Sequence, residues 1–156
     1  MAPMDKYMRW ARSPLGILVI VLVISLGLIA FLDIANRHTS ADTMLVNGRS
    51  FSLEVAQTEH ARELGLGARA SLPADHGMLF VFDHVAPECF WMKDMHFPLD
   101  IIWVSSDKKV VHIEQNVSPS TYPNSFCPVE PVKYVIELNA GMAARADIRA
   151  GESLDF

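Results

Sequence analysis

Residues with recognisable catalytic or metal-binding chemistry are scarce in this sequence. It has only two cysteines, and its six histidines form no His-x-His or His-Glu-x-x-His pair. Those spacings place two imidazoles on one metal ion, and because they are absent the sequence predicts no metal site. The alternative is a site assembled in space from His76, His84, His96 and an aspartate. A nucleophile elbow, a phosphate-binding glycine loop and a dinucleotide fingerprint are also missing, so no cofactor is expected.

Positive charge is also limited, and it is unevenly distributed. Residues 1–39 carry four basic against two acidic residues, a net charge of +2, whereas residues 40–156 carry nine against 16, a net charge of −7. An acidic domain repels a phosphate backbone, so we expect no nucleic acid partner. The change in composition near residue 40 leaves about 115 residues, which is enough for one domain with its own core.

A long apolar run lies near the start of the chain. From Leu15 to Leu32 the only polar side chain is Ser25, and a helix of this length spans about 27 Å, close to the hydrocarbon thickness of a bilayer. Three basic residues precede the run and one follows it closely, so the positive-inside rule places residues 1–14 in the cytoplasm. The run therefore predicts a transmembrane signal-anchor helix over residues 15–32, with the lipid bilayer as its partner.

A cleaved signal peptide is the alternative interpretation of this run. Its apolar region would cover only about 7–15 residues and would be followed by a small-x-small cleavage site. The run here is longer, and the nearest acceptable site, at residues 39–41, lies well beyond its end. We therefore favour a single-pass protein of the cytoplasmic membrane. A tether over residues 33–42 would precede a domain over residues 43–156, in the periplasm or on the extracellular side.

The exported segment is predicted to be mainly β. Residues 43–46 and 49–55 flank Asn47-Gly48, the pair that suits a two-residue type I′ turn, and so predict a hairpin. Thr58 is a suitable N-cap for a short helix over residues 59–64. Further strands are expected at residues 77–82, 90–92, 99–104, 110–117, 134–138 and 153–156, with a proline-rich loop over residues 118–131. This pattern predicts an α+β fold, a small closed or nearly closed β-barrel with one or two short helices.

Candidate binding residues lie in the most aromatic part of the chain, residues 77–102, where charged side chains interrupt the apolar runs. Trp91 and Met92, next to Lys93, are placed to line a ligand cleft. Ordinary core packing of the tryptophan and the methionine is the alternative.

Two carboxylates are candidates for a catalytic acid and base. Asp100 and Glu137 each lie within an otherwise apolar strand, where an unpaired charge is costly. Lys93 is the expected partner for one of them. A structural role, as an ion pair or as a carboxylate that accepts backbone N–H bonds, is the alternative to catalysis.

Cys89 and Cys127 are compatible with three interpretations. Outside the cytoplasm two thiols commonly pair, and a bridge that closes a loop of about 38 residues stabilises the fold by about 4 kcal/mol. Alternatively, Cys127 is a nucleophile of the sortase type, although Pro128 follows it and no histidine is evidently its base. Two unpaired structural thiols are the third interpretation.

Four separated blocks of the sequence resemble, in the same order, the domain of unknown function (DUF) 192 family. They are Gly77-Met78-Leu79-Phe80-Val81-Phe82, Phe90-Trp91-Met92-Lys93, Pro98-Leu99-Asp100-Ile101-Ile102 and residues 134–141. The resemblance implies a small, mainly-β, often exported domain with no established activity. Matching positions give Trp91, Lys93, Asp100 and Glu137 as site residues. Asp94-Met95 stand where the family usually has Asn-Thr.

The function expected from these observations is that of a membrane-anchored extracytoplasmic binding or accessory module. Its ligand would lie over Trp91, Met92 and Lys93, and a glycan or another envelope component is the class considered. An envelope hydrolase or transferase that uses Asp100 and Glu137 as acid and base is one alternative. A structural tether in an envelope complex is the other.

Overall fold

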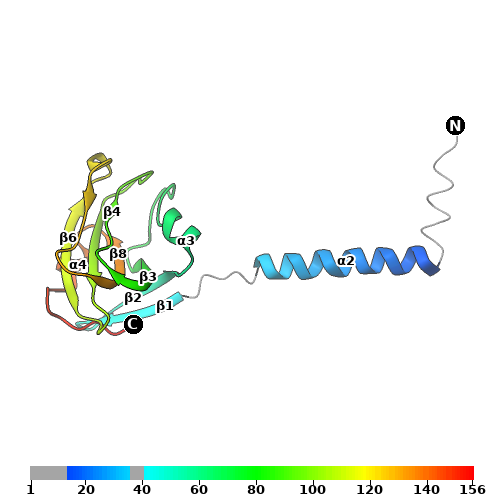
Figure 1. Cartoon of the computed structure of the whole chain (residues 1–156), viewed down its shortest axis with the longest axis horizontal. Coiled ribbons are helices and arrows are strands. Elements are labelled where there is room, and N and C mark those ends of the chain that lie inside the picture. Colours follow the sequence, from blue (N-terminus) through cyan, green and yellow to red (C-terminus); the bar gives the residue numbers. More distant parts are fainter. Residues whose placement is uncertain (1–13, 36–40) are drawn as a thin grey trace. The chain divides into compact units, whose positions relative to one another are not determined.

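The computed structural model describes residues 14–35 and 41–156, and side-chain environments within residues 14–25 and 42–156. The chain divides into two compact units, residues 1–38 and 39–156. In the first unit, helix α2 spans Pro14–Ala35 and contains the predicted apolar run (Figure 1). Over the residues described, no helix is both long and apolar enough to cross a membrane. Residues 1–13 of the predicted cytoplasmic segment and residues 36–40 of the predicted tether lie outside the described residues.

The second unit is built on one mixed six-stranded sheet with the strand order β1-β2-β3-β8-β5-β6. Its strands are β1 Ala41–Val46, β2 Arg49–Ala56, β3 His76–Ala86, β5 Leu99–Val104, β6 Val110–Val117 and β8 Val132–Asn139. Strands β2 and β3 run parallel, and the other neighbouring pairs are antiparallel. A separate two-residue ladder joins β4 Phe90–Trp91 to β7 Ser125–Phe126.

The elements that depend on local chemistry form where the sequence predicts them. Asn47 and Gly48 join β1 to β2 with φ angles of 47° and 77°, as a type I′ turn requires. Helix α3 spans Glu59–Leu64, and the side chain of Thr58 caps its first turn. The helix ends at Gly65, whose φ of 51° favours glycine.

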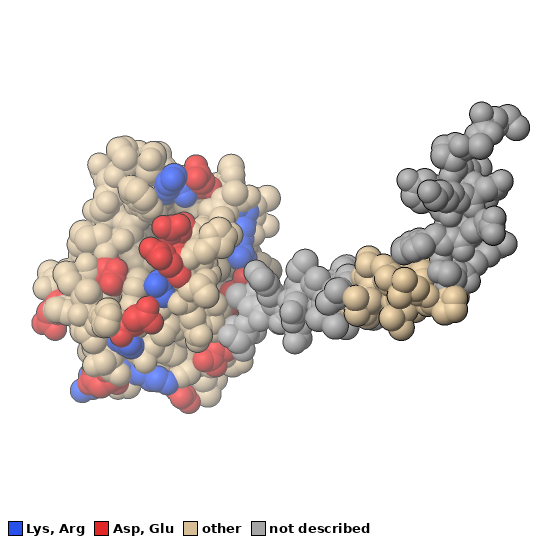
Figure 2. Space-filling view, turned by 45° about the vertical axis from the view of Figure 1, so that its right-hand side comes forward, with Lys and Arg blue, Asp and Glu red and all other residues tan. Residues whose placement is uncertain are grey.

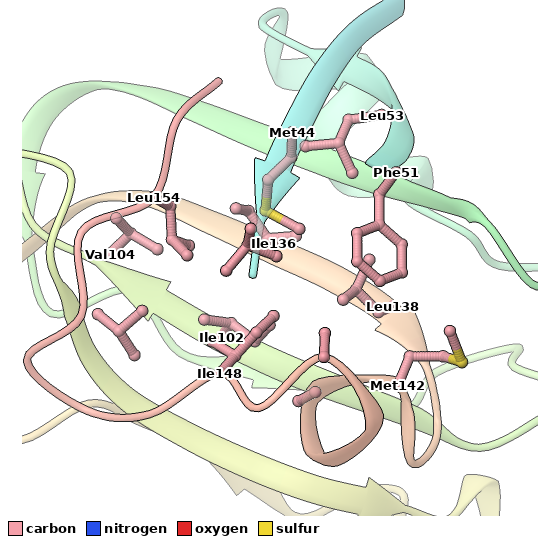
Figure 3. Packing of buried hydrophobic residues seen from close by; sticks show 14 of the residues in the cluster. Met44, Phe51, Leu53, Ile102, Val104, Ile136, Leu138, Met142, Ile148 and Leu154 are labelled. Atoms are coloured by element: carbon pink, nitrogen blue, oxygen red, sulfur yellow. The ribbon is translucent and has the colours of Figure 1, made fainter. Parts of the chain in front are cut away.

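Two hydrophobic clusters cover the two faces of the sheet. On one face, side chains from the strands pack against helix α4, Met142–Arg145, and against the C-terminal segment. Figure 3 labels ten of them: Met44, Phe51, Leu53, Ile102, Val104, Ile136, Leu138, Met142, Ile148 and Leu154. The opposite face carries Met78, Phe80, Leu99, Ile101, Trp103 and Val135, covered by Ala61, Leu66, Leu72 and Met92. We call these the α4 face and the α3 face.

The predicted closure of the sheet is wrong. Strands β1 and β6 are its two edges, and the expected strand at residues 153–156 is replaced by single bridges from Leu45 to Asp155 and from Lys109 to Ser153. The amide of Leu154 donates a hydrogen bond to the carbonyl of Lys108, just before β6, and the carbonyl of Asp155 accepts one from the amide of Leu45 in β1. The C-terminal segment therefore contacts both edges without extending either ladder.

The segment from residue 118 to residue 131 is also more ordered than an irregular loop. It contains a 3₁₀ turn at Pro119–Thr121, capped by the side chain of Ser118, and the short strand β7.

On the face of the unit shown in Figure 2, acidic and basic side chains lie interspersed.

Candidate functional site

A cleft of about 720 Å³ opens on the α3 face of the sheet. Its floor is formed by Phe80 and Phe82 of β3 and by Glu137 of β8. Helix α3 and the loop that follows it form one wall, and residues 88–95 contribute the other. This volume is typical of sites that hold a small molecule or a short segment of a polymer.

An exposed aromatic side chain lies at this cleft. Trp91 belongs to β4 and is 52% exposed, with the ring of Tyr122 at 5.8 Å in an edge-on arrangement. The ammonium group of Lys93 lies 6.0 Å from the centroid of the Trp91 ring. The β4–β7 ladder connects the segment that carries Trp91 to the one that follows Tyr122. The indole is therefore held in position while one side of it remains open to solvent.

Cys89 and Cys127 reinforce this arrangement because they form a disulfide, with their Cα atoms 4.2 Å apart. The bridge lies next to the β4–β7 ladder, since each cysteine is adjacent in sequence to one of its phenylalanines. A bonded sulfur is not a free nucleophile, so the sortase-type interpretation of Cys127 is wrong.

Aromatic rings packed edge to face support the floor of the cleft. The ring of Phe90 meets those of Phe80, Phe82 and Trp103 edge to face, at centroid distances of 4.9, 6.3 and 6.2 Å. The indole N–H of Trp103 donates a hydrogen bond of 2.7 Å to the carbonyl of Glu88. This packing fixes the cleft wall against the sheet, so the cavity is largely preformed.

The carboxyl group of Glu137 is the most unusual group in the cleft. Its side chain shares the α3 face with Met78 and Ile101, its register partners on β3 and β5, and the residue is only 5% exposed. Among the side chains described, those of residues 14–25 and 42–156, none pairs with this carboxyl group by a hydrogen bond or an ion pair. Burial raises the pKa of Glu137 to about 8, although the positive charge of Arg69 opposes the increase.

Arg69 is paired with another carboxylate. Its guanidinium group binds Glu54 through two contacts of 2.5 and 2.8 Å, and this pairing lowers the pKa of Glu54 and raises that of Arg69. Glu54 and Glu137 lie in the same row of the sheet, one on each side of Met78. Arg69 is thus bound by Glu54, and none of the described side chains is a bonded counter-ion of Glu137.

Three of the predicted site residues come together, and two do not. Trp91, Lys93 and Glu137 all line the cleft. Met92 does not, because its side chain is 1% exposed and packs in the hydrophobic cluster of the α3 face. Asp100 lies on the α4 face, where its carboxylate accepts hydrogen bonds from backbone N–H groups.

The predicted pairing of Asp100 with Glu137 as acid and base is wrong. Asp100 is in register with Leu138, and Ile101 is in register with Glu137, so the two carboxyl groups point to opposite faces of the sheet. The predicted ion pair with Lys93 is wrong as well, since in the part of the chain that the structure describes Lys93 pairs with neither carboxylate. The two groups cannot act together on one substrate.

Sequence reasoning missed the Glu54–Arg69 pair. Arg69 follows α3 in an irregular segment, where no periodicity indicates the direction of its side chain. The alternative metal site built from His76, His84 and His96 is not assembled, because no three His, Cys, Asp or Glu side chains among the described residues are grouped so as to hold a metal ion.

These features define a small mixed-sheet domain with a disulfide-braced cleft on one face. The DUF192 family, described as an uncharacterized ACR, matches residues 43–156, and the chain belongs to this family. No curated protein matches the chain significantly.

Two solved structures are similar to the domain. One is a protein of unknown function from Novosphingobium aromaticivorans DSM 12444, 31% identical, with a TM-score of 0.70 over 74% of this chain and 85% of that chain. The other, from Sinorhizobium meliloti 1021, is named a putative transcription regulator; it is 35% identical, with a TM-score of 0.67 over 72% of this chain and 89% of that chain.

Proposed function

We propose that this protein is a membrane-tethered binding domain of the cell envelope and that its cleft holds a segment of a glycan. The observation that carries the proposal is the half-exposed Trp91 at a preformed cleft, next to the ammonium group of Lys93, which has no carboxylate partner among the described residues. The C–H face of a sugar ring stacks on an indole, and charged side chains at its rim bind the sugar hydroxyls. An aromatic platform with a few placed polar groups is the general design of a small-ligand site.

The glycan proposal is tested by measuring how oligosaccharides bind to the full chain in detergent. Tetrasaccharides of N-acetylglucosamine and of glucosamine serve as probes, and calorimetry measures their binding affinity. We expect Trp91→Ala to weaken binding at least about tenfold, because the loss of an aromatic anchor in an interface commonly costs roughly 1.4 kcal/mol or more.

Leu45→Ala is the matched control for this experiment. Leu45 is exposed to a similar extent, 54%, but it lies on β1 and does not line the cleft. The variant should bind like the wild type. Binding that Trp91→Ala leaves unchanged, or no binding of either tetrasaccharide, contradicts the proposal.

The membrane tether is the second part of the proposal. It is supported by the apolar sequence of residues 15–32, by the basic residues before it, and by the disulfide, since such bonds persist in oxidising compartments.

In a bacterial host, we expect the full chain to stay in the membrane pellet after an alkaline wash. We also expect protease added outside spheroplasts to digest the domain. A variant without residues 1–32 should leave the pellet. Release of the full chain by the wash, or protection of the domain from external protease, contradicts the tether.

A further inference from the structure

The buried titratable side chain of the cleft lining is Glu137. Glu137 is only 5% exposed, yet no atom of its carboxyl group is both fully buried and without a hydrogen-bond partner, so the carboxyl group meets solvent through the cleft that it lines. Its main chain lies inside the sheet between β3 and β5, so the part of Glu137 that lines the cleft is its side chain. A ligand that enters the cleft therefore meets an acceptor that no described residue uses.

The walls around this carboxyl group are predominantly acidic. Helix α3 contributes Glu59 and Glu63 to the lining, and the opposite wall contributes Glu88 and Asp94. Four carboxylates around a partly enclosed cavity attract cations and repel anions.

The basic groups near the cleft leave little positive charge free to oppose this field. The guanidinium group of Arg62 donates to the carbonyls of Gln57 and Val81 and lies 3.8 Å from the carboxylate of Asp83. Lys93 remains, and its ammonium group lies over the ring of Trp91. It is the one basic side chain of the lining for which the described residues provide no carboxylate partner.

Four other titratable groups on this side of the sheet form two pairs. Arg69 is bound to Glu54, which also feels the charge of His76. Glu114 of β6 is the register partner of Ile101, which is itself the register partner of Glu137. Its carboxylate oxygen lies 3.1 Å from Nε2 of His112. None of these pairs supplies a counter-ion to Glu137.

The aromatic lining also suits a cation. Phe80, Phe82, Phe90 and Trp91 all border the cleft, and the faces of aromatic rings attract ammonium groups. We propose that the glycan held in the cleft carries a free primary amine, as an amino sugar does, and that its ammonium group pairs with the carboxylate of Glu137. This inference rests on the proposed function and specifies its ligand.

The proposed pairing has a proton balance that can be measured. Because the pKa of Glu137 is raised to about 8, the carboxyl group carries a proton in slightly acid solution. Pairing converts the carboxylic acid and the ligand ammonium into a carboxylate–ammonium pair, and the carboxyl proton leaves for the solvent. Close to one proton is therefore released for each amine bound.

The test compares the two tetrasaccharides, which have the same sugar rings. The glucosamine tetramer carries primary amines where the N-acetylglucosamine tetramer carries acetamides. At about pH 6.5, where both Glu137 and the amine are largely protonated, we expect the wild type to prefer the glucosamine tetramer at least about tenfold. Calorimetry in two buffers of different ionisation enthalpy should show about one proton released with the amine and none with the acetamide. Glu137→Gln should lose both the preference and the proton release.

A second variant keeps the test independent of Glu137. Lys93→Gln retains a hydrogen-bond donor but removes a positive charge from the cleft, so we expect it to strengthen binding of the glucosamine tetramer and to leave the acetylated tetramer nearly unchanged. Equal or tighter binding of the acetylated tetramer, dependent on Trp91, overturns the amine inference and leaves the glycan proposal standing. If neither tetramer binds, both are overturned.

Discussion

Glu137→Gln should stabilise the protein by about 5 kcal/mol in alkaline solution and change its stability little near pH 4. The folded chain holds the Glu137 carboxyl group at a pKa of about 8, against an ordinary value of 4.5. Below pH 4.5 the group is protonated in both states. Between the two values only the folded state keeps the proton, so the stability of the wild type falls by about 1.4 kcal/mol per pH unit, and above about pH 8 the loss is complete.

Urea unfolding of the full chain at several pH values measures this difference, with the fluorescence of the buried Trp103 as one signal. Glu130→Gln is the matched control, because Glu130 is exposed and its replacement should change stability little. The Glu54–Arg69 pair has the opposite effect on the pH dependence of stability. Because the pKa of Glu54 is lowered, the stability that this pair contributes is lost as the pH falls into the acid range. A Glu137→Gln difference that is flat from pH 4 to pH 9 would show that folding does not raise the pKa of Glu137.

The parts of the fold that sequence reasoning predicted correctly depend on neighbouring residues. The Asn47-Gly48 turn requires positive φ at two consecutive positions, and Thr58 supplies the acceptor that the first turn of α3 needs. Strands β5 and β6 have the predicted bounds because the turn residues before β6 and the bend before β5 delimit them. In each case the chemistry that determines the element lies within a few residues of it.

The faces of the central strands could not be predicted in this way. Every residue of β5 is buried, so the strand lacks the alternation of polar and apolar side chains that indicates which face a residue occupies. The direction of Asp100 relative to Glu137 follows from the register of β8 between β3 and β5, which joins residues more than 30 positions apart. The acid–base hypothesis failed at this step, although both carboxyl groups had been identified as unusual.

The cleft combines local and distant information. Trp91 and Lys93 were identifiable as site residues because charged side chains interrupt an aromatic-rich stretch there, whereas Met92, from the same stretch, packs in the hydrophobic cluster of the α3 face. Arg69 and its partner Glu54 are 15 positions apart and meet only because β2 and β3 are parallel neighbours with α3 between them in the chain. The electrostatic environment of Glu137 is consequently a property of the tertiary structure.

Asp100→Ala is expected to lower the free energy of unfolding by about 3–5 kcal/mol. The carboxylate is fully buried and accepts hydrogen bonds of 2.9 Å from the amide of Asn116 and 2.8 Å from the amide of Ala143. Asn116 has a φ of 56° at an irregularity in the β5–β6 ladder, and Ala143 belongs to the first turn of α4, whose N-cap, Gly141, has no side chain to offer. Alanine would leave both amides unpaired, and each such loss costs about 1–3 kcal/mol.

Asp100→Asn separates this structural role from any role in the cleft. One oxygen remains to accept a hydrogen bond while the amide NH₂ faces the second N–H group, so we expect a loss of about 2–3 kcal/mol in urea unfolding. Asp94→Asn, a replacement of the same kind at an exposed cleft residue, is the control and should leave stability within about 0.5 kcal/mol of the wild type. Because Asp100 lies on the α4 face, its asparagine variant should bind the tetrasaccharides with wild-type affinity as long as it is folded. Loss of binding by the folded variant would mean that the two faces of the sheet are coupled, and that Asp100 positions the cleft from behind.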